Sequence, residues 1–260
     1  MIFRSKLAAQ ESEGTVCGAF EAIAGVQKQA AATDWYVTQP DHARLSGEVA
    51  AAFDSRKVPN VSQAVARAIA LHDVGWMPFD GDMSAPHEPT RLESGAPLSF
   101  ASTEPEMFLR AWQGSIQAAQ STGPLGGLIV SAHLARLSHP YLERGAGTAE
   151  QRALVEEFLH REAARVERLL PQAGLPLEEI EALVGVLQFC DLASLYFCAN
   201  PAAPVELPQV LNGSRVQLSF EQGSFRMRPN LLDHVLVLEI PCVRWVDGKA
   251  QREVVPVKVQ

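Results

Sequence analysis

The stretch VSQAVARAIALHDVGW, residues 61–76, carries the pattern from which the fold can be worked out. Its alanine, leucine, isoleucine and arginine content favours an α-helix, and Gly75 lies where a left-handed C-terminal cap would fall. At a helical period one apolar face collects Val61, Val65, Ala68, Ile69 and His72. Asp73 follows at once. A buried imidazole beside a carboxylate needs a partner, because burying unpaired polar groups costs several kcal/mol.

Three other predicted helices also place an ionisable residue on an apolar face. His42 lies in TQPDHA, where Pro40 fits the first turn of a helix; His133 lies in LIVSAHL; Asp191 stands within the Leu/Val stripe of residues 183–195. One such histidine is ordinarily hydrogen-bonded inside a core. Four converging polar intrusions favour a common partner, and a divalent cation held by imidazole nitrogen and carboxylate oxygen is the economical one.

The order His42, His72-Asp73 and Asp191 on successive helices resembles the HD-domain superfamily of metal-dependent phosphohydrolases. The strings TQPDHA, ALHDVGW, SAHLARL and FCDLASLY are more closely similar to an uncharacterised branch of that superfamily, a family of unknown function, over roughly residues 34–200. The resemblance implies a mainly α-helical bundle, with His42, His72, Asp73 and Asp191 around one metal. It also allows a second metal near His133.

A phosphohydrolase reading assigns further roles. The ion held by Asp73 and its fellow ligands would acidify a water and polarise a phosphoryl oxygen, while His133 would transfer a proton, contact phosphate or hold a second metal. Gln39, and Arg136 one helical turn from His133, are candidate substrate contacts. Relatives that cleave cyclic dinucleotides often carry lysine where this chain has Trp76, so cyclic dinucleotides should be poor substrates. Trp76 would wall an apolar part of the pocket or pack in the core.

Two alternative functions stay open. Some members of the superfamily use a mixed-valent di-iron centre to oxidise C–H or C–P bonds, which needs further histidines; this chain offers His87, His139 and His160. The third reading is a regulatory or ligand-binding module that keeps its metal for structure. A nitrogen and oxygen ligand set accepts Mn, Fe, Co, Ni or Zn, so neither the identity of the metal nor the number of ions follows from the sequence.

Composition limits the partners. A formal net charge of −8 argues against a nucleic-acid polymer and against an anionic membrane surface. A small phosphate-containing substrate remains compatible, because a metal supplies local positive charge. The four cysteines show no CxxC spacing and the start lacks a signal peptide, so we expect a cytoplasmic protein. The oligomeric state is open, a homo-oligomer included.

The composition changes after residue 200. Alternating apolar residues around Gln222-Gly223 and Asp247-Gly248 predict an antiparallel β meander. We therefore expect an HD-like helical metal-binding domain over residues 1–200 and a small β-rich appendage over 201–260, mainly α and α+β overall. Residues 1–4 and 34–37 predict two short paired strands. Residues 77–103, rich in Pro, Gly, Ser and Asp, predict a loop that forms a lid or pocket wall.

Overall fold

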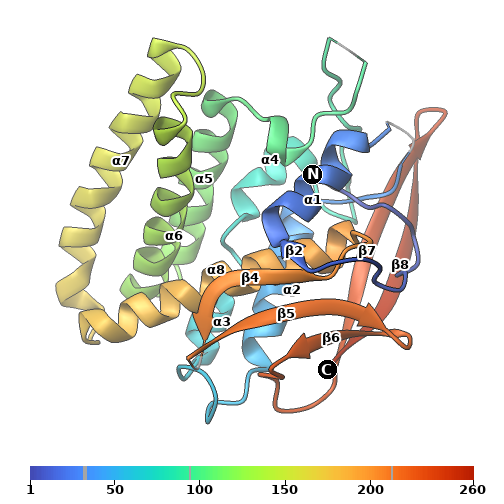
Figure 1. The fold of residues 1–260 in the computed structure, drawn as a ribbon. Helices are drawn as coiled ribbons and strands as arrows, with labels where there is room; N and C mark the ends of the chain where they lie inside the picture. The colour runs from blue at the N-terminus through green and yellow to red at the C-terminus, as the bar shows by residue number, and fades with distance from the viewer. Residues whose placement is uncertain (32–33, 94, 212) are drawn as a thin grey trace.

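The computed structural model describes residues 1–31, 34–93, 95–211 and 213–260 (Figure 1). Helices form one side of the molecule and a curled sheet the other, with the helix α8 running between them. The α-helices are α1 (Ala19–Gln29), α2 (Gln39–Ala51), α3 (Gln63–Ile69), α4 (Met77–Asp80), α5 (Pro105–Gln120), α6 (Pro124–Glu143), α7 (Ala149–Leu169) and α8 (Leu177–Ala199). Short 3₁₀ turns lie at η1 (Val74–Trp76), η2 (Phe100–Ser102) and η3 (Leu170–Gln172).

The described residues form one mixed sheet of eight strands in the order β1-β3-β7-β8-β6-β5-β4-β2. Its members are β1 (Ile2–Phe3), β2 (Cys17–Gly18), β3 (Tyr36–Val37), β4 (Val205–Leu211), β5 (Ser214–Glu221), β6 (Ser224–Arg228), β7 (Leu236–Val246) and β8 (Lys249–Val259). The pairs β2–β4 and β6–β8 are parallel and the others antiparallel. The sheet curls into a half-barrel rather than lying flat as a meander.

The prediction of a mainly α-helical fold with a small antiparallel meander is therefore wrong, and the fold is α+β. The strand pair at residues 1–4 and 34–37 is confirmed, with Ile2 opposite Val37. That pair continues into the main sheet, because Tyr36 pairs with Val243 of β7. Two-residue strands carry no periodicity of their own. They form here by pairing with the edges of longer strands, β3 with β7 and β2 with β4. The sheet thus joins residues on both sides of the predicted boundary at residue 200.

The hairpin turns follow the sequence closely. Gln222 and Gly223 join β5 to β6, and Asp247 and Gly248 join β7 to β8; all four residues have φ between 50° and 72°. Positive φ at both central positions is what a two-residue hairpin of matching twist requires. β7 is one strand of 11 residues and accommodates Pro241 opposite Val254 of β8.

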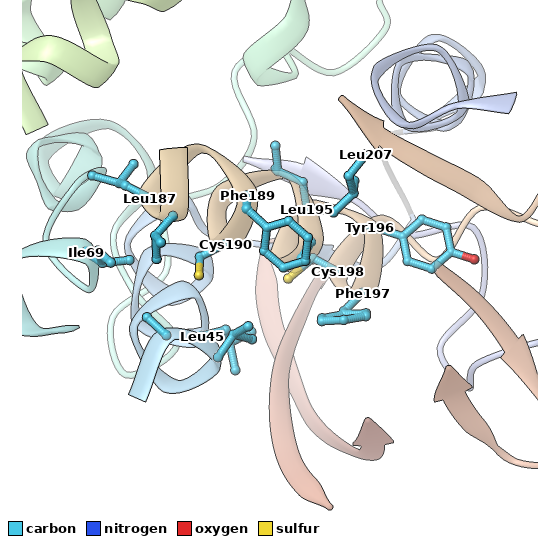
Figure 2. Packing of buried hydrophobic residues seen from close by; sticks show 14 of the residues in the cluster. Leu45, Ile69, Leu187, Phe189, Cys190, Leu195, Tyr196, Phe197, Cys198 and Leu207 are labelled. Atoms are coloured by element: carbon cyan, nitrogen blue, oxygen red, sulfur yellow. The ribbon is translucent and has the colours of Figure 1, made fainter. Parts of the chain in front are cut away.

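Helix α8 forms the centre of the hydrophobic core. Its apolar residues pack against helices on one side and against β4 and β6 on the other (Figure 2). By length and composition α8 could cross a membrane, but 78% of its apolar window is buried inside the protein, as in a core helix. Its C-terminal carbonyls are satisfied by the buried Arg4, which donates to Phe197 at 2.6 Å and to Cys198 at 2.9 Å. Residues near the N-terminus and strands of the C-terminal sheet thus both contact α8, which also carries Asp191.

Candidate metal centre

The chain around the His-Asp pair departs from the predicted helix. α3 ends at Ile69, residues 70–73 form turns, and the 3₁₀ turn η1 follows. Gly75 is not a left-handed cap. A Cβ at this position would lie 1.9 Å from the carbonyl oxygen of Ala111, so glycine is needed for the close approach of α5. Its amide donates to Ser115 Oγ at 3.0 Å. Packing against α5 therefore overrides the helical propensity of residues 70–76.

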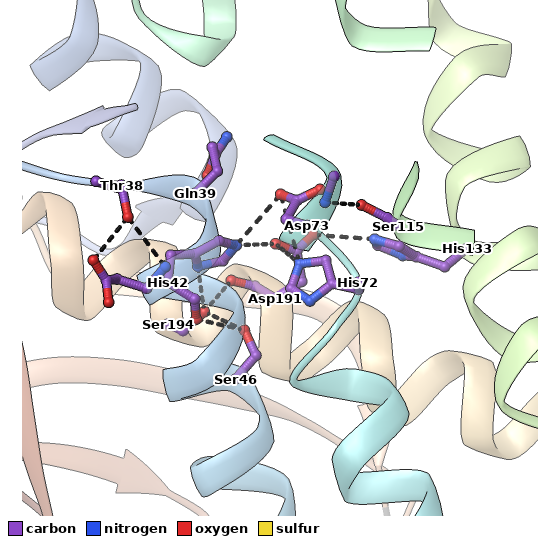
Figure 3. A network of polar contacts seen from close by, with 12 residues as sticks. Thr38, Gln39, His42, Ser46, His72, Asp73, Ser115, His133, Asp191 and Ser194 are labelled. Atoms are coloured by element: carbon purple, nitrogen blue, oxygen red, sulfur yellow. Dashed lines mark hydrogen bonds and ion pairs between the residues drawn. The ribbon is translucent and has the colours of Figure 1, made fainter. Parts of the chain in front are cut away.

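Four separate segments bring the predicted ligands together (Figure 3). The first turn of α2, capped by Thr38 through the Asp41 amide at 3.2 Å, presents His42. The turn after α3 presents the His-Asp pair, and α6 and α8 present one ligand each. All five predicted ligands are buried, at 0 to 8% exposure: His42, His72, Asp73, His133 and Asp191.

The ring nitrogens face the carboxylates across one small space. Asp191 Oδ1 lies 3.1 Å from His42 Nε2 and 3.5 Å from His72 Nε2. Asp73 Oδ2 lies 3.8 Å from His42 Nε2 and 3.7 Å from His72 Nε2. Ligand atoms of His42, His72 and Asp191 lie within 4.8 Å of one another. The other carboxylate oxygen of Asp191 faces His133 Nε2 at 3.5 Å.

The two central histidines turn their Nε2 atoms into that space. His72 Nδ1 lies 2.8 Å from the Ile69 carbonyl oxygen, which can only accept, so Nδ1 carries the proton and the neutral ring leaves Nε2 bare. His42 Nε2 lies 3.1 Å from Asp191 Oδ1 and has no hydrogen-bond partner. His72 Nε2 likewise has no hydrogen-bond partner. The buried His42, His72 and Asp191 could therefore hold a metal ion.

The buried carboxylates also favour a positive charge at this site. Burial lowers the pKa of His72, but the carboxylates of Asp73 and Asp191 outweigh burial and raise this pKa to about 9. Burial raises the pKa of Asp191, but the adjacent His42 and His72 rings outweigh burial, so the pKa falls well below its usual range. Burial raises the pKa of Asp73. A proton on His72 thus balances part of the negative charge of Asp73 and Asp191.

His133 is placed differently from the other two histidines. Neither of its ring nitrogens has a hydrogen-bond partner, although the side chain is fully buried. Burial is the main cause that lowers its pKa to about 3. His133 is therefore a neutral imidazole whose tautomer no neighbour fixes, next to Asp191 and outside the tight group of three.

The predicted substrate contacts divide into two kinds. Gln39 and Trp76 are buried, and Gln39 Oε1 and Trp76 Nε1 have no hydrogen-bond partner. The backbone amide of Gln39 donates to Asp80 Oδ2 at 3.1 Å. Arg136 instead binds Glu181 and donates to Gln188 Oε1 at 3.4 Å, so its guanidinium is engaged by α8. Only the first two keep polar atoms free for a ligand.

The other histidines named as candidate ligands lie away from the cluster. His87 is exposed and its Nδ1 lies 3.1 Å from the Phe79 carbonyl oxygen. His160 is exposed on α7, and His139 is exposed on α6. His139 lies within the helix, because α6 continues through Pro140 to Glu143.

The loop after the His-Asp pair is held by the sheet. Tyr36 Oη and Trp245 Nε1 donate to the His87 carbonyl oxygen at 2.8 and 3.1 Å, and Arg252 donates to the Met83 carbonyl oxygen at 2.7 Å. Between this loop and η1 lies a cavity of about 190 Å³, whose lining residues include Trp76, Phe79, Asp80, Thr90 and Leu98. None of the five predicted metal ligands is among its lining residues. Residues of this loop thus line a cavity beside the candidate site, and their role as a lid or pocket wall of that site stays a prediction.

Sequence reasoning missed two residues that contact the centre. Ser194 Oγ lies 2.7 Å from His42 Nδ1, and Ser46 Oγ lies 2.7 Å from Ser194 Oγ. A usable signal existed, since Ser46 follows His42 by four residues and Ser194 follows Asp191 by three. Both spacings put a serine on the ligand's own helical face.

Comparison with known proteins gives a family and no function. No curated protein and no solved structure matches the chain significantly. The model of one family, described as "Protein of unknown function (DUF3891)", matches residues 26–242. That family description carries no link to the HD-domain superfamily, so the resemblance to that superfamily stays a prediction. Because this match spans most of the chain, the protein belongs to the DUF3891 family.

Proposed function

We propose that this protein is a metal-dependent hydrolase of the HD type that acts on a small phosphate ester or nucleotide in the cytoplasm. One observation carries the proposal. Two buried imidazole nitrogens and two buried carboxylates, from His42, His72, Asp73 and Asp191, face one space with no hydrogen bond joining ring to carboxylate. Lone pairs that face one another in a dry interior are stable only around a cation or a proton.

The donor set fits a divalent transition metal. Imidazole and carboxylate ligands suit Mn, Fe, Co, Ni and Zn, and the hydrogen bond to the Ile69 carbonyl holds His72 in the metal-binding tautomer. A divalent ion bound there would supply Lewis acidity toward a phosphoryl oxygen and a water molecule. The acidic chain, with a net charge of −8, has little else to attract a phosphate to this site.

The open side of the centre lies at the carboxylates. The side chains of Asp73 and Asp191 are 11% and 9% exposed, whereas those of His42 and His72 are 0% and 1% exposed. Substrate must therefore approach from the carboxylate side. His133 meets Asp191 from another helix and has both ring nitrogens free, so it is placed to pass a proton or to donate an N–H to a phosphoryl oxygen.

Two unpaired buried atoms support specific substrate contacts. Gln39 Oε1 can accept a hydrogen bond from a substrate hydroxyl or amine, and Trp76 Nε1 can donate one to an oxygen. An indole in place of lysine brings no charge, so a substrate with a second phosphate to steady is disfavoured. Arg136 is a weaker candidate because Glu181 and Gln188 already occupy its guanidinium.

The di-iron oxygenase reading has less support. It needs further histidine ligands, and His87, His139 and His160 are all exposed. Within the described part of the chain, the residues that could hold an ion are those of the cluster around Asp191. No observation favours a second function over the hydrolase.

A panel of phosphomonoesters and nucleotides, assayed on protein reconstituted with Mn or Co, tests the proposal. We expect slow hydrolysis that disappears in Asp191→Asn, which keeps side-chain size but removes the charged ligand. Activity that survives in Asp191→Asn would belong to a contaminant. A clean null across the panel, with oxygen consumption by an iron-loaded sample, would overturn the hydrolase in favour of the oxygenase.

A further inference from the structure

The outer face of His42 meets a pair of buried serine hydroxyls. Ser194 Oγ lies 2.7 Å from His42 Nδ1, 2.7 Å from Ser46 Oγ and 2.9 Å from the Asp191 carbonyl oxygen. Ser46 Oγ also lies 3.2 Å from the His42 carbonyl oxygen. Both serines are fully buried, so water does not compete for these contacts (Figure 3). The group links α2 to α8, the two helices that carry His42 and Asp191.

A count of protons decides the tautomer of His42. The two carbonyl oxygens of this group can only accept, and each hydroxyl has one proton. With a proton on His42 Nδ1, three protons serve the four contacts of the group; with Nδ1 bare, only two do. Buried polar groups are stable in the arrangement that satisfies more of them. The serine pair therefore favours the Nδ1–H tautomer, which leaves Nε2 free.

His72 reaches the same tautomer by a different route. Its Nδ1 donates to the backbone carbonyl of Ile69, three residues earlier in the chain. A carbonyl cannot rotate into a donor, so the orientation of His72 is insensitive to side-chain changes nearby. A hydroxyl can turn its proton toward Nδ1 and impose the opposite tautomer. His42 therefore depends on what keeps the Ser194 proton turned away from the ring.

We propose that Ser194, oriented by Ser46, is the positioning residue that holds His42 with Nε2 free for the metal. Ser194 gives its proton to the Asp191 carbonyl and accepts one from His42 Nδ1. Ser46 approaches Ser194 from the α2 side and keeps the hydroxyl in this orientation. This inference rests on the metal site of the proposed function, and it assigns a role to two residues that bind neither metal nor substrate.

Nitrogen-15 NMR of the metal-free protein at pH 8 tests the tautomer directly. The wild-type His42 ring should show a protonated Nδ1 and a bare Nε2. In Ser194→Ala the Nδ1–H loses its acceptor, and we expect a mixture of tautomers. In Ser46→Ala the Ser194 proton is free to turn, and a smaller shift in the same direction is expected. A wild-type ring that carries its proton on Nε2 would overturn the proposal without any variant.

Cobalt titration gives the second readout. Removing an outer partner of a metal-bound histidine lowers metal affinity about 10- to 100-fold, which is the loss expected for Ser194→Ala. The matched control is Ser138→Ala, because Ser138 is also fully buried and donates to a backbone carbonyl of its own helix, at 2.7 Å. The control should keep wild-type affinity, and thermal melting should show both variants folded.

A third variant separates this inference from the proposed site. His42→Ala should lose cobalt affinity by more than Ser194→Ala does. If His42→Ala binds cobalt like the wild type, His42 is not a ligand and the metal site itself fails. If His42→Ala loses cobalt while Ser194→Ala and Ser46→Ala keep both affinity and tautomer, the site stands and the positioning role is wrong.

Discussion

The candidate metal site and the curled sheet differ in the burial and pairing of their charged side chains. In the cluster, Asp191 is buried and faces three histidines with no hydrogen bond to any of their rings. On the sheet, Glu221 binds Arg228 in an ion pair whose side chains are 41% and 56% exposed. An exposed pair is solvated and contributes little, whereas a buried group without its partner is costly. Buried charge inside the helical half therefore marks a candidate metal site, and the exposed ion pair on the sheet marks support.

Removing the central carboxylate should have the largest effect on this contrast. Asp191→Ala is expected to abolish tight metal binding, because Asp191 faces all three buried histidines of the cluster. Glu221→Ala is the matched change on the sheet, and it should leave metal affinity unchanged and alter stability by less than about 1 kcal/mol. Metal titration and thermal melting of both variants check this. Wild-type affinity in Asp191→Ala would remove Asp191 from the ligand set.

The substitution Gly75→Ala should disturb the packing of η1 against α5 in the helical half. The new Cβ would meet the Ala111 carbonyl oxygen at 1.9 Å, so η1 must move away from α5. We expect a loss of about 1–3 kcal/mol in unfolding free energy, together with weaker metal binding, since Asp73 is two residues away. The control is Gly25→Ala in α1, where a Cβ meets nothing within 4 Å and helix propensity should add about 0.5–1 kcal/mol.

Equal stabilities of these two glycine variants in urea unfolding would contradict the close approach of η1 and α5. Retained stability in Gly75→Ala with lost metal would instead show that the turn moves without unfolding the core.

Acid should weaken metal binding at a pH well above that of an ordinary histidine site. The pKa of His72 is raised to about 9 in the metal-free protein, and a metal must displace that proton. Metal affinity should therefore fall about tenfold for each pH unit below about 9, until further groups titrate. Equilibrium dialysis between pH 6 and pH 9 measures the slope. Affinity that does not change with pH would mean that His72 is not a ligand.

The same shift has a definite sign for the stability of the metal-free protein. The folded-state pKa of His72 lies above its unfolded value of roughly 6.5, so its stabilisation is complete below that value and is lost as pH rises toward about 9. Asp191 acts in the opposite sense, since its lowered pKa makes its contribution disappear at low pH. Urea unfolding of chelator-treated protein at pH 6.5 and pH 9 should show the loss of stability at the higher pH.

The smallest expected effect belongs to the sheet and its hold on the loop. Trp245→Phe removes the donor to Tyr36 Oη at 2.8 Å and to the His87 carbonyl oxygen at 3.1 Å. One lost hydrogen bond of this kind is worth about 1 kcal/mol, and metal affinity should stay unchanged. Proteolysis near residues 81–89 should become faster. A change in metal affinity would mean that the sheet directly influences the geometry of the metal site.

Residue pattern alone determined the elements that local chemistry controls. The apolar stripe of α8 is long and regular, so its helix and the position of Asp191 within it follow from periodicity. Asp247 and Gly248 adopt the positive φ of a two-residue turn, which few other residue pairs tolerate. His42, His72 and His133 were recognisable because a polar side chain on an apolar face needs a partner wherever it is buried.

Only the tertiary structure decided the features that depend on contacts between distant segments. Helical propensity runs on through residue 76, yet α3 ends at Ile69 because α5 packs against the backbone of Gly75. Two-residue strands such as β1 and β3 have no signal beyond their pairing, so the single mixed sheet could not be read from either end of the chain. The tautomer of His42 depends on Ser194, 152 residues away in the chain. The local sequence sets the conformation that each segment favours, and contacts between distant segments decide whether the folded protein keeps that conformation.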